Sequence, residues 1–153
     1  MLCSSSCCSW YGTSYAVNFE LDRELNGASV ELNIIGVTER TRGQWQNLLV
    51  DNYFGSARQK NTIDKEVIHF NQNLNIKNLS ILSPVWERWE KMGATHIYVI
   101  ASIPGVTSDL RGENDPRVQL IPLSYCYWKV RDINFVVQSS GLRLLTPMND
   151  YKE

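Results

Sequence analysis

The chain has 153 residues, with 15 basic and 16 acidic side chains and an apolar share of 43%. A chain of this length can bury a core as one domain, and the composition excludes disordered and collagen-like chains. Because the charges nearly cancel, the sequence offers no electrostatic footprint for nucleic acid or an anionic membrane surface, and no stretch approaches the roughly 18 uninterrupted apolar residues that span a bilayer.

The cysteines are unevenly distributed. Three of them crowd the first eight residues: Cys3, Cys7 and Cys8. Cys126 stands alone near the other end. A zinc site would need further ligands at a suitable spacing, and the isolated His69 and His96 do not supply them, so we expect no metal. A disulfide between the terminal cluster and Cys126 is an alternative in an oxidising compartment.

A third interpretation is that the Cys/Ser-rich terminus is the processed end of a lipoprotein signal. Such a signal places a small residue before the acylated cysteine, which Ser6 provides for Cys7, whereas Leu2 precedes Cys3. We therefore predict that Cys3 or Cys7 carries a lipid anchor. An unmodified, unstructured terminus is the alternative.

Two strands are predicted after this terminus. Alternation of apolar and polar residues, with period two, runs through Ala16–Leu21 and again through Ser29–Val37. The dipeptide Asn26-Gly27 is a favoured chain reversal, so we expect these two strands to pair as antiparallel neighbours. The residues from Asp22 to Leu25 lengthen the connection into a charged, exposed loop.

The next segment changes its period. Thr41 and Gln44 match a capping box, and apolar residues then recur at steps of three and four until Gly55, which predicts one short amphipathic helix. We expect Trp45 in this helix to be a core anchor rather than a ligand platform. The segment Thr62–Phe70 is predicted to be a strand. The Asn-rich segment Asn71–Ile81 is expected to be an exposed or bulged strand.

A second helix is predicted to begin at Ser83-Pro84 and to end at Gly93. Its charged residues fall on one side, so the helix should cover a sheet or close one end of a sandwich. We expect Trp86 and Trp89 to be buried, with an exposed aromatic surface for a carbohydrate or a protein partner as the alternative.

The last third of the chain contains four predicted elements. Thr95–Ser102 is apolar on both faces and should be a central strand. The loop Ile103–Arg117 is too polar to pack as core. Val118–Leu123 contains a proline and should lie at an edge, and Ile133–Leu145 should close a terminal hairpin.

Seven or eight short strands and two short helical insertions predict a mainly β fold, an antiparallel β-sandwich. We expect a tether over residues 1–15 and a single domain over residues 16–153. The sequence contains no nucleophile elbow, zinc-protease motif or phosphate loop. Cys126 and His96 form the only imaginable thiol and imidazole pair outside the tail, and both are better interpreted as strand residues. We therefore expect no enzyme and no cofactor.

The order of these segments resembles the outer-membrane lipoprotein family of type VI secretion systems. The features that match are the Asn-Gly turn after the first strand, the strand Ser29–Val37, the helical insertion Trp45–Phe54, the strands Thr95–Ser102 and Val118–Leu123, and the closing hairpin Ile133–Leu145. The resemblance implies a transthyretin-like β-sandwich, held by an acylated N-terminal cysteine in the periplasmic leaflet of the outer membrane. It also implies a structural role without catalysis.

In that family the loop between the first two strands contacts the periplasmic part of an inner-membrane component. Carried over by position, the partner-binding residues are Asp22, Arg23, Glu24, Leu25 and Asn26. The resemblance makes Leu25 an exposed anchor, so Leu25→Asp with Arg23→Glu should abolish pull-down of the partner without changing thermal unfolding. The alternative is that these residues only turn the chain.

Two other functions remain open from the sequence. The first is a ligand-binding sandwich with an aromatic platform for sugars, formed by Tyr98, Tyr125, Tyr127 and Trp128. The second is a subunit of a phage-tail-like assembly, in which Asn-rich edge strands pair between copies.

Overall fold

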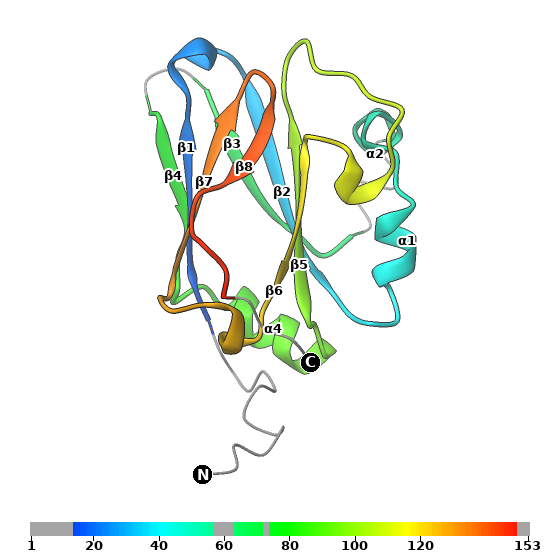
Figure 1. The fold of residues 1–153 in the computed structure, drawn as a ribbon, viewed down its shortest axis with the longest axis vertical. Helices are drawn as coiled ribbons and strands as arrows, with labels where there is room; N and C mark the ends of the chain where they lie inside the picture. The colour runs from blue at the N-terminus through cyan, green and yellow to red at the C-terminus, as the bar shows by residue number, and fades with distance from the viewer. Residues whose placement is uncertain (1–13, 57–62, 72–73, 150–153) are drawn as a thin grey trace.

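Two β-sheets pack face to face in the computed structural model, which describes residues 14–56, 63–71 and 74–149 (Figure 1). Within these ranges, sheet A contains, in spatial order, β4 (Ile76–Leu79), β1 (Ala16–Leu21), β7 (Asp132–Gln138) and β8 (Gly141–Leu144). Sheet B contains β3 (Glu66–Phe70), β2 (Val30–Val37), β5 (His96–Ser102) and β6 (Val118–Pro122). The predicted β-sandwich is confirmed.

The first two strands do not pair with each other, so that prediction was wrong. β1 pairs antiparallel with β4 and parallel with β7, whereas β2 pairs with β3 and β5. The turn signal was correct, since Gly27 has a φ of 80°, which glycine adopts without strain. The connection is too long for a tight hairpin, however, and it carries the chain from one sheet to the other.

The facing sides of the two sheets form the main hydrophobic core. The residues that alternate inward along the first two strands are at most 4% exposed, as predicted: Val17, Phe19, Leu21, Val30, Leu32 and Ile34. Phe19 stacks on Phe135 of β7 with ring centroids 5.2 Å apart. β5 lies between β2 and β6, which confirms its predicted central position.

A second apolar cluster lies on the outer face of sheet B, beneath α1 (Arg42–Gln46) and α2 (Val50–Gly55) (Figure 1). Trp45 is 5% exposed and packs on Tyr98 with ring centroids 5.0 Å apart, so it is the core anchor that we expected. The single predicted helix is two helices, because the carbonyl of Leu48 accepts the N–H of Gly112 at 2.8 Å. The capping box is absent, since the Thr41 hydroxyl bonds to Thr38 instead.

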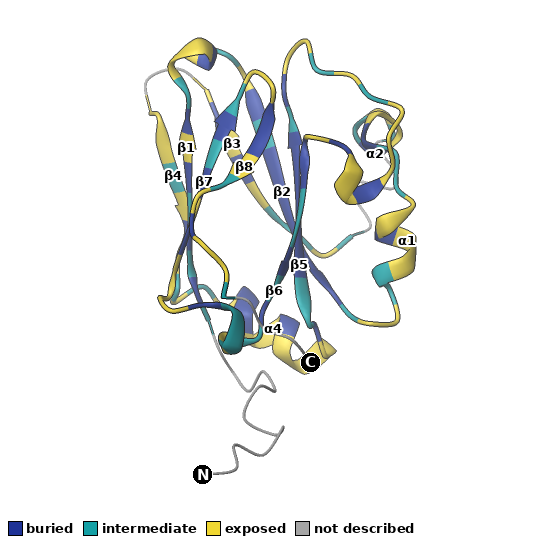
Figure 2. Ribbon diagram, viewed as in Figure 1, coloured by how far each residue is buried: buried dark blue, intermediate teal, exposed yellow. Residues whose placement is uncertain are grey.

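The helix α4 (Val85–Met92) lies at the lower end of the sandwich and ends at Gly93, as predicted (Figure 1). Its buried side faces the sheets and its charged side is exposed (Figure 2). Trp86 is 5% exposed and Trp89 is fully buried. The alternative of an exposed aromatic surface on this helix was therefore wrong.

The remaining strand predictions are largely confirmed. β3 covers the second half of its predicted segment, and β4 is the exposed strand expected in the Asn-rich segment. Pro122 is the last residue of the edge strand β6, and β7 and β8 form the terminal hairpin. None of the helices in the described ranges has the length and apolar character needed to cross a bilayer.

The loop that ends at Arg117 was predicted to be too polar for the core, and this was wrong at its C-terminal end. Asp115 is fully buried and Arg117 is 3% exposed. The Arg117 guanidinium donates to Asp115 at 2.7 and 3.0 Å and to Asp51 of α2 at 2.6 Å. Hydrogen bonds to Asp115 raise the pKa of Arg117 above its ordinary value. Pairing offsets the desolvation that would otherwise exclude these charges from the interior.

Candidate functional site

The predicted partner-binding residues lie at the upper end of the sandwich, between β1 and β2 (Figure 1). Arg23–Leu25 form a 3-10 turn, η2, and Asp22 caps it by accepting the N–H of Arg23 at 2.8 Å. The N–H of Asn26 then donates to the Arg23 carbonyl at 3.1 Å. The loop is therefore a small ordered turn with its own backbone hydrogen bonds.

Leu25 is not the exposed anchor that the family resemblance implied. Its side chain is 6% exposed and belongs to the main core, because the turn of η2 directs it back between the sheets. An aspartate at this position would place a charge in the core, so Leu25→Asp would also destabilise the fold. The assumption that Leu25 is exposed was wrong, and we now expect Leu25→Asp to lower the temperature of unfolding.

The exposed part of the loop is polar and continues onto a neighbouring turn. Arg23, Glu24 and Asn26 are exposed. The Ser139 hydroxyl, in the turn between β7 and β8, donates to the Glu24 carboxylate. This contact joins the loop and the hairpin turn into one surface, which we call the loop surface. It presents a cation, carboxylates and an amide.

The predicted lipid-anchor residues, Cys3 and Cys7, lie outside the described residues. Cys126 is disulfide-bonded, which agrees with the disulfide alternative for this residue. A bonded Cys126 cannot act as a thiol nucleophile with His96.

Most of the predicted tether, residues 1–13, lies outside the described residues. The prediction that the tether extends to residue 15 was wrong. Tyr15 is 1% exposed and donates its hydroxyl to the Leu123 carbonyl at 2.6 Å. Burial raises the pKa of this hydroxyl well above its ordinary value. The folded part of the chain therefore begins before Ala16.

The predicted aromatic platform for sugars does not form. Tyr98 is fully buried beneath α1 and α2, and Trp128 is 6% exposed, with its indole N–H donating to the Pro122 carbonyl at 2.8 Å. Tyr125 is 48% exposed, and Tyr127 is half-buried. These rings therefore do not share one exposed face.

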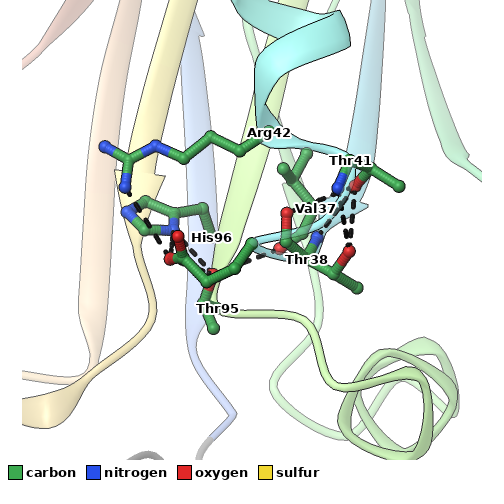
Figure 3. Close-up of polar contacts among 7 residues, drawn as sticks. Val37, Thr38, Thr41, Arg42, Thr95 and His96 are labelled. Carbon is green, nitrogen blue, oxygen red and sulfur yellow. Dashed lines mark hydrogen bonds and ion pairs between the residues drawn. The ribbon is translucent and has the colours of Figure 1, made fainter.

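His96 lies in a polar cluster at the start of β5 (Figure 3). Its Nδ1 is 2.9 Å from the Thr95 hydroxyl and 4.0 Å from a Glu39 carboxylate oxygen. Burial, and then the charge of Arg42, lower the pKa of His96, so the ring is neutral near pH 7. The cluster joins the turn before α1 to β5. In the described ranges, no three His, Cys, Asp or Glu side chains could together hold a metal ion.

A groove of about 620 Å³ on the outer face of sheet A was missed by the sequence analysis. Its lining includes Asn18, Glu20, Ile76, Asn134 and Leu145. The sequence feature that could have indicated this groove is Ile76, an apolar residue at an outward position of β4. It pairs with the outward-facing Glu20 and is 66% exposed. It was overlooked because single exposed apolar residues are common.

Comparison with known proteins identified similar folds only among solved structures. No protein-family model and no curated protein matched the chain. The structure of Serratia marcescens Lip, a membrane-bound component of the type VI secretion system, is 18% identical and has a TM-score of 0.56, covering 90% of this chain and 99% of that one. A chain of a type VI membrane complex is 10% identical and has a TM-score of 0.53, covering 87% of this chain and 98% of that one. The chain therefore has the fold that the resemblance implied.

Proposed function

We propose that this chain is a structural, non-enzymatic subunit of a type VI secretion membrane complex. The likeness of fold carries the proposal, because it extends over 90% of this chain and 99% of Lip. Two chains from such assemblies share the sandwich, and neither likeness depends on a single motif.

The proposed location is the periplasmic face of the outer membrane, with Cys3 or Cys7 as the acylated residue. The disulfide at Cys126 supports an oxidising compartment such as the periplasm. Two acyl chains on this cysteine would give stable anchoring, whereas one chain alone would bind the membrane only marginally.

The proposed contact with an inner-membrane component is the loop surface. Asp22, Arg23, Glu24 and Asn26 supply its polar groups, and Leu25 supports it from below. A rigid turn loses little conformational entropy on binding, and mixed charges give orientation and specificity more than affinity. We therefore expect a modest interface that depends on charge.

The test is a pull-down of the full-length chain with the periplasmic part of the inner-membrane component. Arg23→Glu with Asn26→Asp changes two exposed side chains and should weaken retention about tenfold by placing negative charge on the loop surface. Thermal unfolding should stay within about 2 °C of the wild type, because neither side chain is buried.

The matched control is Arg40→Glu, which reverses an exposed charge in the turn before α1. It should leave retention unchanged. Unaltered retention of the loop variant, or equal losses in both variants, would remove the loop assignment. Failure of the wild-type chain to sediment with outer membranes would contradict the proposed location.

A further inference from the structure

The two outer faces of the sandwich differ in what covers them. α1 and α2 pack over sheet B and enclose the second apolar cluster. Over the outer face of sheet A, no helix lies within the ranges that the structure describes (Figure 1). The outer face of sheet A is therefore accessible to a binding partner.

The floor of the groove on this face is a pair of amides. Asn18 of β1 and Asn134 of β7 stand opposite each other in the parallel pair, and the Asn18 Nδ2 donates to the Asn134 Oδ1 at 2.9 Å. The apolar walls are Ile76 on one side and Leu145 with Pro147 on the other, while Val130 also lines the groove. The large, exposed hydrophobic residues of the lining are Ile76, Val130 and Leu145, at 66%, 52% and 45%.

One wall of the groove is held in place by hydrogen bonds. The N–H of Leu145 donates to the Asn134 carbonyl at 2.7 Å. The Thr146 hydroxyl accepts the N–H of Asn134 at 2.8 Å and donates to the Asp132 carbonyl at 3.1 Å. A preformed wall reduces the entropy lost when a ligand binds.

The groove is acidic. Glu20 and Asp132 are its charged lining residues, and both are exposed. Arg143 stands on the same face of sheet A, opposite Val136, but does not line the groove. Two carboxylates between apolar walls complement a cation that is flanked by apolar groups, and a guanidinium can bond a carboxylate through two N–H groups.

We propose that this groove docks a short extended segment of a partner protein, with an arginine or lysine between apolar side chains. Nucleic acid and anionic lipid would be repelled by the carboxylates. A sugar would find no exposed ring among the lining residues, since Phe19 and Phe135 are at most 1% exposed. The inference rests on the lining of the groove and does not depend on the proposed function.

The probe for the test is a soluble peptide with Val-Arg-Val between glycine and serine flanks. A matched peptide carries Val-Glu-Val. Each is titrated into the ¹⁵N-labelled full chain and followed by NMR of the backbone amides. The arginine peptide should shift the amides of Asn18, Glu20, Asn134, Leu145 and Thr146. The glutamate peptide should bind about tenfold more weakly, because two carboxylates repel it.

Two double variants separate the contribution of charge from that of apolar contact, and one single variant is the control. Glu20→Lys with Asp132→Lys should reverse the preference between the two peptides. Ile76→Ser with Leu145→Ser should weaken binding of the arginine peptide, whereas Leu82→Ser, at an 88% exposed leucine outside the groove, should not. Equal binding of both peptides, shifts on another surface, or equal losses in the serine variants would overturn the proposal.

Discussion

Gly36 of β2 lies against the indole of Trp89, which belongs to the main core. A Cβ at this glycine would be 2.4 Å from Trp89 Cδ1, so the fully buried ring would have to move. We expect Gly36→Ala to lower the free energy of unfolding by about 1–3 kcal/mol, the usual cost of overpacking.

Urea denaturation checks this prediction, with Gly43→Ala as the control. A Cβ at Gly43 meets nothing within 4 Å, and the residue is an exposed position of α1. Alanine there should leave stability unchanged or raise it by up to about 1 kcal/mol. Equal free energies of unfolding for the two variants would contradict the steric argument.

His96 makes stability depend on pH. Its pKa is lowered from 6.5 in the folded state, chiefly by burial, so below pH 6.5 the unfolded chain binds a proton before the folded chain does. Stability from this group is therefore complete above pH 6.5 and is lost as the pH falls toward the folded pKa. Arg42 adds to the lowering, whereas Glu39 and Glu113 oppose it.

The measurement is the urea midpoint between pH 7.5 and 5 for the wild type and for His96→Gln. The wild-type midpoint should fall more steeply with decreasing pH, because the variant has no ring to titrate. Parallel slopes would show that His96 contributes nothing to the pH dependence.

At the scale of elements, Arg117 joins the loop after β5 to α2. It donates to the fully buried Asp115 and also to Asp51. Removing one partner of a buried ion pair leaves an uncompensated charge, so Arg117→Met should lower the free energy of unfolding by about 3–5 kcal/mol.

The comparison is Arg88→Met, which removes an exposed ion pair. Arg88 bonds Asp64 at 3.2 Å and Glu66 at 3.4 Å, and its side chain is 49% exposed. Screening by water limits the contribution of such a pair to the free energy of unfolding to about 0–1 kcal/mol. Chemical denaturation of both variants should therefore separate them clearly, and similar losses would contradict the assigned burial.

The elements that were predicted well from local sequence have residues at their ends that specify where they begin and end. α4 has a serine and a proline at its start and Gly93, with a φ of 83°, at its end. Local sequence does not specify which strands pair with each other. Asn26-Gly27 specifies a reversal but not which sheet receives the next strand, and therefore β1 and β2 were paired wrongly.

The candidate site shows the same limit. Leu25 looked like an exposed residue in a charged loop, but the turn of η2 returns its side chain to the core. The burial of Asp115 and Arg117 depends on Asp51 from a distant part of the chain. The groove depends on the parallel alignment of Asn18 with Asn134, which no local pattern reports.

For the whole molecule, the two candidate contact surfaces adjoin along one strand. Glu20, near the end of β1, lines the groove, and Asp22 begins the loop surface directly after this strand. A partner that occupied both would extend along the outer face of sheet A, from the start of β7 to the loop surface. Such a partner would contact a surface that α1 and α2, on the far side of sheet B, leave open (Figure 1).

The parallel alignment of β1 with β7 also has a consequence for biosynthesis. The ribosome delivers residues 16–21 early, yet the strand that completes their hydrogen bonding, residues 132–138, is among the last to emerge. The antiparallel set of β2, β3 and β5 is available for pairing well before that. A nascent chain must therefore keep its first strand open on one side until translation is almost finished, and a translocated chain that enters N-terminus first faces the same delay.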